Sequence, residues 1–150
     1  MPTAILTNTT AKDEAAIRLV IEAIAKAHHD KDAAAIAAPY APDAVLYDLA
    51  PPLRHLGQDL DGVQAWLDTW EGPIENEARD FNFTIVGALA LGHGYFRLAG
   101  LKKGEGPIGF WMRATMVLRR DDSGWRIVHE NTSVPFYMDG SLRPAFDLEP

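Results

Sequence analysis

The last third of the sequence carries polar side chains at a spacing that can place them on one face of a strand. His129, Asn131 and Ser133 alternate in the segment WRIVHENTSV, and alternate residues of a strand point to the same face of a sheet. If that face lines a cavity, His129 can serve there as an acid or a base near neutral pH. The structural alternative is a histidine held by a hydrogen bond to a neighbouring strand or to the adjacent glutamate. The opposite face, which we expect to meet solvent or a partner subunit, carries Arg126, Val128, Glu130 and Thr132.

Asp48 is a second candidate, at the end of the segment DAVLYDL and just before Ala50-Pro51-Pro52. A carboxylate that faces an apolar cavity loses hydration, which raises its pKa and makes it a better base at neutral pH. The alternative is an aspartate that caps the end of a strand in solvent. Tyr47 precedes Asp48, so only one of the two is expected to point inward.

Arg113 lies in the apolar segment FWMRATM, where an arginine requires an anion or several hydrogen-bond acceptors. It is a candidate to bind a substrate carboxylate or to pair with Asp48. Alternation favours another interpretation, because it places Arg113 on the face opposite Met112 and Met116. There it would form a cross-strand ion pair.

Trp66 and Trp70 are one helical turn apart and are therefore expected on one face of a helix. Such a pair forms either part of the core or the wall of a ligand pocket. The remaining histidines fall at a helix end (His28, His29) or in loops (His55, His93). No two of them have the spacing of metal ligands on one element, so we predict no metal site.

Hydrophobic periodicity and turn residues predict the elements that position these side chains. The predicted helices span residues 13–29, 33–38 and 63–70; the predicted strands span residues 43–49, 81–90, 95–102, 110–120 and 125–134. A Gly92-His93-Gly94 turn is expected between the first two long strands. This order predicts an α+β fold in which three N-terminal helices pack on a curved antiparallel sheet, a cone-shaped arrangement with a small-molecule pocket. We expect a flexible lead-in over residues 1–12 and a single domain over 13–150.

Composition excludes several classes of function. The chain has 150 residues, no cysteine and a net charge of −7, which argues against thiolate chemistry, disulfides and nucleic-acid binding. No stretch is long and apolar enough to span a membrane, and no secretory signal precedes the domain, so we expect no membrane partner and a cytoplasmic location. Phosphate-binding loops, dinucleotide fingerprints and nucleophile elbows are missing from the sequence, so we expect no cofactor.

The motifs Phe110-Trp111-Met112-Arg113-x-Thr115, Gly124-Trp125-Arg126-Ile127-Val128-His129-Glu130 and Ser133-Val134-Pro135-Phe136 follow a helical opening and the DAVLYDL strand. Together they resemble the SnoaL-like, ketosteroid isomerase-like branch of the nuclear transport factor 2-like superfamily, from about Asp13 to Pro150. The resemblance implies a cone-shaped α+β barrel, usually a homodimer, with a pocket between helices and sheet. Members include isomerases, cyclases, epoxide hydrolases, dehydratases and binding modules, so the fold does not fix the reaction. Many relatives carry a second histidine where this chain has Asn131.

The resemblance also implies that Asp48 takes the place of the general base of ketosteroid isomerases. The oxyanion hole of those enzymes is formed by a tyrosine and a protonated acid, and an ungapped placement puts Ile24 and Met116 at these positions. Neither can donate a hydrogen bond, so we do not expect steroid isomerisation by that mechanism. Arg113, Tyr47 and His129 are the candidates to replace the missing donors.

We therefore predict an enzyme that isomerises, cyclises or dehydrates a small hydrophobic carbonyl compound by acid–base chemistry. In this hypothesis Asp48 is the base, His129 is an acid, and Asn131 and Ser133 orient the ligand. The pocket would be lined by Tyr47, Trp66, Trp70, Arg113 and Met116. Two alternatives remain: a non-catalytic module that binds an apolar ligand in the same cone, and a dimerisation domain whose cone is filled.

Overall fold

The computed structural model describes residues 3–150, and for residues 3–9 it describes the backbone alone. The helices are α1 (Thr3–Asp30), α2 (Ala33–Ala37) and α3 (Leu60–Leu67); the strands are β1 (Tyr40–Tyr47), β2 (His55–Leu56), β3 (Trp70–Val86), β4 (Leu89–Lys102), β5 (Gly106–Asp121) and β6 (Gly124–Ser133). The strands form one curved sheet in the order β2-β1-β6-β5-β4-β3. All neighbours are antiparallel except β1 and β6, which are parallel. The predicted α+β fold, with its N-terminal helices against a curved sheet, is confirmed.

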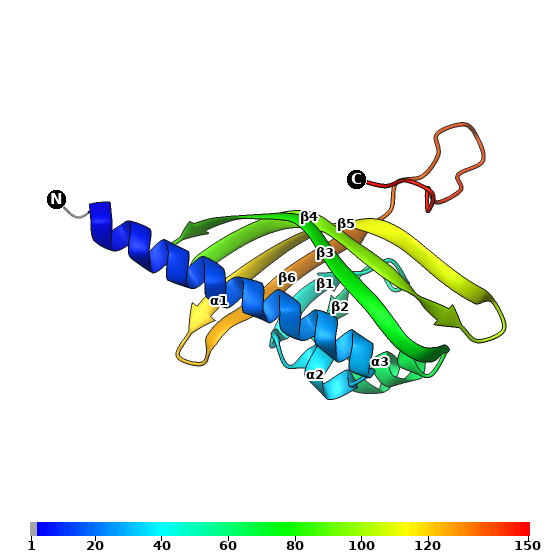
Figure 1. Ribbon diagram of the computed structural model, residues 1–150, viewed down its shortest axis with the longest axis horizontal. Coiled ribbons are helices and arrows are strands. Elements are labelled where there is room, and N and C mark those ends of the chain that lie inside the picture. Colours follow the sequence, from blue (N-terminus) through cyan, green and yellow to red (C-terminus); the bar gives the residue numbers. More distant parts are fainter. Residues whose placement is uncertain (1–2) are drawn as a thin grey trace.

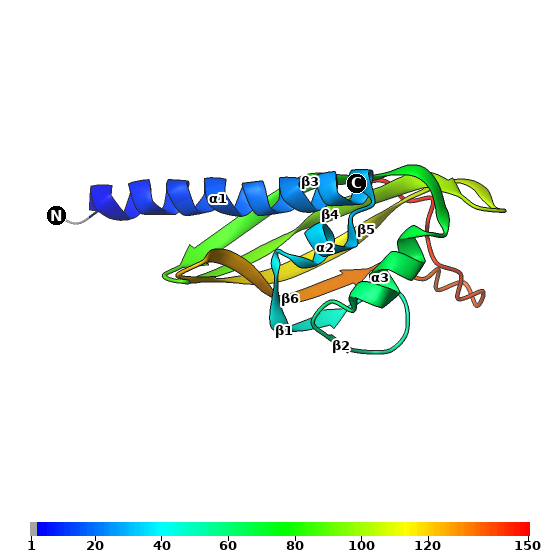
Figure 2. The ribbon, with the colours of Figure 1, turned by 90° about the horizontal axis from the view of Figure 1, so that it is seen from below.

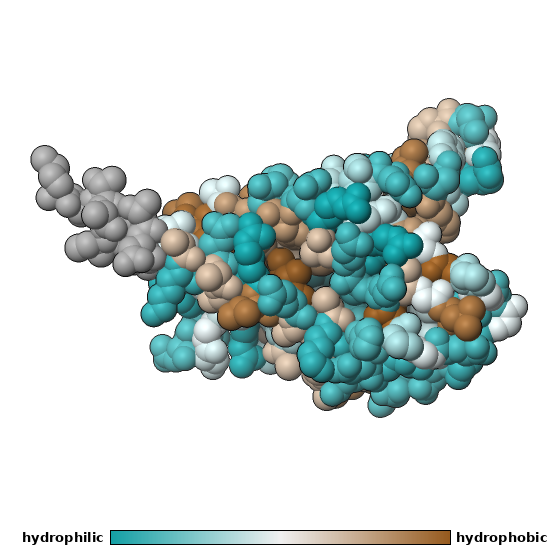
Figure 3. Space-filling view, viewed as in Figure 1, coloured by the Kyte–Doolittle hydropathy of each residue, from teal (hydrophilic) through white to brown (hydrophobic). Residues whose placement is uncertain are grey.

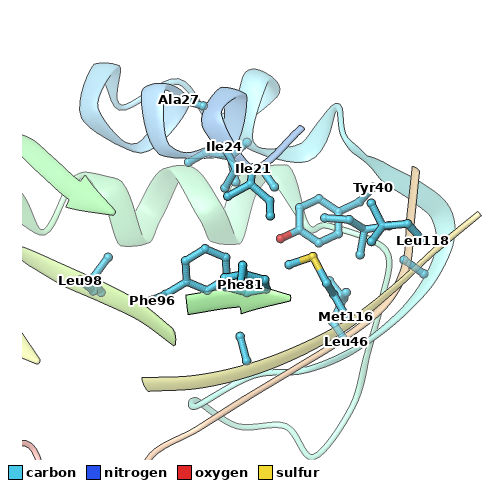
Figure 4. Close-up of a cluster of buried hydrophobic side chains, with 14 of the residues drawn as sticks. Ile21, Ile24, Ala27, Tyr40, Leu46, Phe81, Phe96, Leu98, Met116 and Leu118 are labelled. Atoms are coloured by element: carbon cyan, nitrogen blue, oxygen red, sulfur yellow. The ribbon is translucent and has the colours of Figure 1, made fainter. Parts of the chain in front are cut away.

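The helices and the sheet enclose one hydrophobic core. Helix α1 runs along the sheet beside β3 (Figure 1), and Figure 2 shows β1 and β2 on the opposite side of the molecule, with α2 and α3 between. Ile17, Ile21 and Ile24 recur at helical spacing on α1 and are all buried, as expected for the apolar face of an amphipathic helix. Figure 4 shows Ile21 and Ile24 above Phe81 on β3, within a cluster of buried side chains from the sheet.

Helix α1 begins at Thr3 and not at Asp13, so it includes most of the segment expected to be a lead-in. Threonine and asparagine lower helix propensity only modestly, and the sequence from Thr3 to Asp30 contains neither glycine nor proline to interrupt the helix. Asp13 therefore lies inside the helix. Its carboxylate is buried, which is a role that the local pattern did not predict.

Several predicted boundaries are wrong, among them those of the strand expected over residues 81–90, which is divided between the end of β3 and the start of β4. Helix α3 ends at Leu67, and Trp70 is the first residue of β3. The expected turn at Gly92 and Gly94 is a continuous part of β4. A side chain at either glycine would collide with an aromatic ring of β3, since an added Cβ would lie 2.4 Å from the Phe83 ring at Gly92 and 2.6 Å from the Phe81 ring at Gly94. These glycines make room for aromatic packing across the strands and do not turn the chain.

Gly57 fixes the loop that follows β1. It has a φ of +66°, its N–H donates to the carbonyl of Ala44 at 2.7 Å, and an added Cβ would lie 2.5 Å from the carbonyl oxygen of Pro42. Gly72 has the same φ but nothing within 4 Å of an added Cβ. A side chain at Gly72 would therefore cause backbone strain without a collision.

We expect Gly72→Ala to lower the free energy of unfolding by about 1 kcal/mol, the cost of a left-handed residue with a side chain. Gly57→Ala should lower it by about 1–3 kcal/mol more, because the backbone must also shift to relieve the contact. Urea denaturation of the two variants measures the difference. Equal losses in the two would show that the contact with Pro42 is relieved without cost.

Candidate functional site

The strand β6 contains a bulge that decides which of its side chains face the core. Val117 pairs with His129 and the next residue, Leu118, pairs with Ile127, so Val128 is the extra residue. Such an extra residue inverts the alternation of the strand from that point on. After Val128, the residues that were expected to meet solvent or a partner therefore lie on the face toward the core.

Glu130 lies on this inner face. It pairs with Met116 on β5 and with Leu46 on β1, and paired residues on adjacent strands point to the same face of a sheet. Met116 and Leu46 are both buried in the hydrophobic core, and Figure 4 shows their side chains in the same cluster. A carboxyl group that the sequence assigned to the opposite face thus borders the interior.

The hydroxyl of Tyr40 donates to Glu130 Oε2 at 3.1 Å. The pKa of Glu130 is raised from 4.5 to about 7, mainly because the carboxyl is buried; the bond from Tyr40 lowers this pKa and the nearby charge of Asp48 raises it. Burial also raises the pKa of Tyr40 well above its ordinary value, with a contribution from the charge of Glu130. Tyr40 is therefore a protonated donor at neutral pH, beside a carboxyl group that can exchange a proton.

Asp48 lies just beyond the end of β1 and is exposed. One of its carboxylate oxygens accepts from the backbone N–H of Leu49 at 2.7 Å and from the Thr132 hydroxyl at 3.4 Å. This is the geometry of the alternative interpretation, an aspartate that caps a strand end. Its charge nevertheless acts on Glu130, so Asp48 lies at the border of the candidate site.

The expected polar stripe faces away from the core. Asn131 and Arg113 are exposed, and the Arg113 guanidinium donates from Nε to the Ser133 hydroxyl at 3.1 Å. The Nδ1–H of His129 donates to the carbonyl of Val45 at 2.7 Å, and its ring is nearly perpendicular to the exposed Tyr47 ring, with the ring centres 5.0 Å apart. The expectation that these residues line a pocket is corrected by the bulge, which places them on the outer face.

The two oxyanion-hole donors of ketosteroid isomerases, which this sequence lacks, are not replaced by Arg113, Tyr47 or His129. Ile24 and Met116 are buried in the core, and Tyr47 and Arg113 are on the outer surface. The donor that the interior does provide is Tyr40. It stands between Pro39 and Pro42 in the sequence and is the first residue of β1.

His55 also differs from its expected place in a loop. It begins β2 and pairs with the buried Leu46, on the strand next to Glu130. Its Nε2 is buried and has no hydrogen-bond partner among the described backbone (residues 3–150) and side chains (residues 10–150). The row His55, Leu46, Glu130 therefore places an imidazole and a carboxyl on either side of one leucine.

A second cluster gathers where α1 ends, α3 ends and β3 begins. Trp66 and Trp70 pack edge to face with ring centres 5.7 Å apart, although Trp70 belongs to the sheet. The ring centres of His28 and Trp66 are 6.0 Å apart, and Lys102 Nζ lies 4.5 Å from the centre of the Trp70 ring. The expected pairing of the two tryptophans thus occurs, through two different elements.

The inner face is open to solvent only in part. Brown hydrophobic atoms show between teal surfaces beside α1 in Figure 3, which has the viewpoint of Figure 1. Two hollows of about 500 and 550 Å³ lie elsewhere, between α2 and α3 and at the edge formed by β3, β4 and β5. Neither is lined by Glu130 or by the two tryptophans, and side chains such as Met116 and Leu46 fill the space beside Glu130.

Within the part of the chain that the structure describes, no three His, Asp or Glu side chains are grouped to hold a metal ion. A search of the same residues finds no helix long and apolar enough to cross a membrane.

Comparison with solved structures defines the class of protein. A nuclear transport factor 2-like protein of unknown function from Pseudomonas putida KT2440 is 31% identical, with a TM-score of 0.80 over 94% of this chain and 98% of that one. A nuclear transport factor 2-like superfamily protein from Salmonella enterica serovar Typhimurium LT2 is 14% identical, with a TM-score of 0.73 over 88% and 97%. A third, from Novosphingobium aromaticivorans and described as having a cystatin-like fold, is 17% identical, with a TM-score of 0.70 over 94% and 92%. The chain has the fold of this superfamily.

The family is narrower than the superfamily. The model of the SnoaL-like domain matches residues 17–137, and the chain belongs to this family. No curated protein matches the sequence. The resemblance drawn from the sequence motifs is therefore confirmed, and the reaction has to be argued from the site.

Proposed function

We propose that this chain is an enzyme that moves a proton on a small hydrophobic carbonyl compound, with Glu130 as the group that takes and returns it. The observation that carries the proposal is a carboxyl group that borders the apolar core, hydrogen-bonded to Tyr40, with a pKa of about 7. A group with this pKa is present in both protonation states at neutral pH, so it can accept a proton and release it again.

The proposed step starts with ionised Glu130. Its carboxylate removes a proton from the carbon next to the substrate carbonyl, the C–H electron pair moves into the enolate, and negative charge collects on the carbonyl oxygen. Glu130 becomes neutral, which weakens its hold on the Tyr40 hydroxyl. That hydroxyl can then donate to the enolate oxygen, and Glu130 returns the proton to the same or another carbon atom.

Two related structures are described by different reactions, and only the first, a dehydration, is of the proposed class. A protein from Streptomyces avermitilis, 17% identical, is described as a candidate dehydratase of the nuclear transport factor 2-like family. A protein from Novosphingobium aromaticivorans, 21% identical, is described as a candidate aromatic ring hydroxylase. Those descriptions belong to those proteins. For this chain we propose isomerisation or dehydration, since both begin with the proton abstraction that Glu130 can perform.

In this proposal Asp48 has a different role from the one that the sequence indicated. It is exposed, and its charge raises the pKa of Glu130, so we propose that it tunes the base. His129 holds the Val45 carbonyl on the outer face and is proposed as a structural residue. A non-catalytic dimerisation domain whose cone is filled is the second candidate function, favoured by the close packing of Leu46 and Met116 beside Glu130.

Deuterium exchange tests the proposed function. The protein is incubated in D₂O with a panel of hydrophobic ketones, and exchange next to the carbonyl is followed by NMR. We expect Glu130→Gln to lower the exchange rate by about 10²- to 10⁴-fold, the usual contribution of a general base. Asp48→Asn should keep the exchange but move its pH midpoint downward, because a charge that raises the pKa of Glu130 is removed.

The matched control is Glu105→Gln, a substitution of the same kind at an exposed residue of the β4–β5 turn. It should exchange at the rate of the unaltered protein. Exchange that is equally fast in Glu130→Gln would exclude Glu130 as the base, and no exchange with any ketone would favour a non-catalytic domain.

A further inference from the structure

We propose that the hairpin formed by the end of β1, the loop after it and β2 (residues 45–56), here called the flap, opens away from β6 and admits substrate to Glu130. Ionisation of Glu130 favours the open form. This inference rests on the proposed function, because it supplies the route to Glu130 that the closed structure lacks. As a statement about motion, it is tested separately from catalysis.

The closed structure leaves no route to the proposed base. Leu46 on β1 and Met116 on β5 pair with Glu130 from its two sides. Both are buried, and Figure 4 shows them within the packed core. Neither of the two hollows is lined by any of these three residues. A substrate therefore reaches the carboxyl group only after one of its neighbours moves.

Leu46 is the neighbour that is free to move, because it belongs to the flap. Its strand, β1, lies between β6 and the edge strand β2, and β2 has only two residues. Met116 lies on β5, which pairs with β4 along the whole of β4 without a register shift. The register of β1 against β6 is instead broken between Tyr40 and Val45. The flap begins at this break.

The flap has a fixed base and a free outer end. At the base, the N–H of Gly57 donates to the carbonyl of Ala44 at 2.7 Å, and both residues are buried. At the outer end, every residue from 48 to 54 is exposed, and Figure 2 shows β1 and β2 on the side of the molecule away from α1. Few buried contacts are typical of segments that open locally. The hairpin can therefore turn about its base while the other strands stay paired.

Few side chains fasten the flap to β6. Among the side chains of residues 10–150, His129 donates from Nδ1 to the Val45 carbonyl at 2.7 Å, and the Thr132 hydroxyl donates to Asp48 at 3.4 Å. The second bond is long and exposed, so it contributes little. On the flap itself, the buried Nε2 of His55 has no partner in the same part of the chain. Opening hydrates this atom, which reduces the cost of breaking the joint.

The charges at the joint favour opening when Glu130 is ionised. Glu130 is faced by the Tyr40 hydroxyl from the start of β1 and by the Asp48 carboxylate just after β1. His55 on β2 is one strand further away, and the residue paired on β5 is apolar. Burial raises the pKa of Glu130, so the closed form favours the neutral carboxyl. Opening hydrates the ionised form and moves the like charge of Asp48 away from it.

This arrangement couples entry of the substrate to the state of the base. Ionised Glu130, which is the form that can take a proton, is also the form that favours an open flap. Proton abstraction leaves Glu130 neutral, and the neutral form favours closure over the enolate. Closure of this kind keeps water away from a reactive intermediate.

Hydrogen exchange of backbone amides measures the opening. Protection factors, which correct for the intrinsic acceleration of exchange with pH, are compared between the flap and β4. We expect flap amides to be at least about tenfold less protected than those of β4 and insensitive to about 1 M urea, as a local opening requires. Between pH 6 and pH 8 their protection should fall roughly tenfold, because the pKa of Glu130 is about 7 when buried and 4.5 when hydrated.

Glu130→Gln should remove this fall, since glutamine does not ionise, and the control Glu105→Gln should keep it. Any contribution from His55 is common to both variants and cancels in the comparison. Flap amides that match β4 in protection and in urea dependence would show that the flap opens only when the whole chain unfolds. A fall that persists in Glu130→Gln would show that another group drives it. Either result overturns the proposal.

A disulfide across the joint tests the route. The chain has no cysteine, and Tyr47 and Asn131 are paired and exposed on β1 and β6, at a separation that a disulfide can span. The oxidised Tyr47→Cys/Asn131→Cys protein should lose the pH-dependent exchange of the flap. It should also exchange deuterium into ketones at least about tenfold more slowly, and dithiothreitol should restore both. The matched control is His93→Cys/Thr115→Cys, an exposed pair on β4 and β5, whose oxidised and reduced forms should exchange ketones equally.

The flap and the proposed function fail in different ways. Ketone exchange that is unchanged in the locked protein would overturn the flap as the route and leave Glu130 as the base. No ketone exchange in any form of the protein would refute the proposed function, and the amide measurements would then decide whether the flap opens.

Discussion

Replacing Asp13 with alanine is expected to lower the free energy of unfolding by about 2–3 kcal/mol. Asp13 is 8% exposed. Its two carboxylate oxygens accept from Arg120 Nη1 at 2.8 and 2.9 Å, and one of them also accepts from Trp125 Nε1 at 3.2 Å. Alanine leaves the buried indole N–H and the guanidinium without this partner. This loss is smaller than that expected for a fully buried ion pair, because the Arg120 side chain is 39% exposed and regains some hydration.

Urea denaturation at pH 7 measures this loss. The matched control is Glu14→Ala, which breaks the ion pair between Glu14 and Arg18 one residue further along the helix. Both of those side chains are more than 40% exposed, and exposed pairs contribute about 0–1 kcal/mol. Similar losses in the two variants would show that Asp13 does not fasten α1 to the end of the sheet.

The Asp13 example shows what the sequence could and could not predict in the fold. Ile17, Ile21 and Ile24 identified the helix and its buried face, because periodicity is a local property. An acid before such a run predicts the first turn of a helix, since negative charge stabilises a helix N-terminus. The partners of Asp13 are at positions 120 and 125, more than a hundred residues away, and no local pattern contains them.

The candidate site was missed for a related reason. Alternation correctly divided β6 into two sets of side chains, but one extra residue at Val128 exchanged the two faces. His129 and Asn131 therefore point outward, and Glu130 faces the core. A bulge is set by pairing with β5, which the sequence of β6 alone does not contain. The tryptophans were easier to predict, because residues four apart are close both along a helix and across the short connection from α3 to β3.

Glu130→Gln is expected to stabilise the protein at alkaline pH. The folded pKa of Glu130 is about 7, above the ordinary 4.5, so between these values the folded chain binds more protons than the unfolded one. Stability from this group is fully present below pH 4.5 and is lost as pH rises through 7. The pKa difference corresponds to about 3 kcal/mol. Glutamine keeps an oxygen that accepts from Tyr40 and cannot ionise, so the variant avoids this loss.

The measurement is the free energy of unfolding of both proteins at pH 4 and pH 8. We expect the variant to gain about 3 kcal/mol relative to the unaltered protein between these two values, while Glu105→Gln should show a constant difference. A constant difference in Glu130→Gln would mean that the carboxyl is hydrated in the folded state, and the proposed base would lose its physical foundation. The expected gain would mean that the chain keeps a destabilising carboxyl at physiological pH. Residues that lower stability in this way are typical of functional sites, so this result would link the position of Glu130 to catalysis before any substrate is identified.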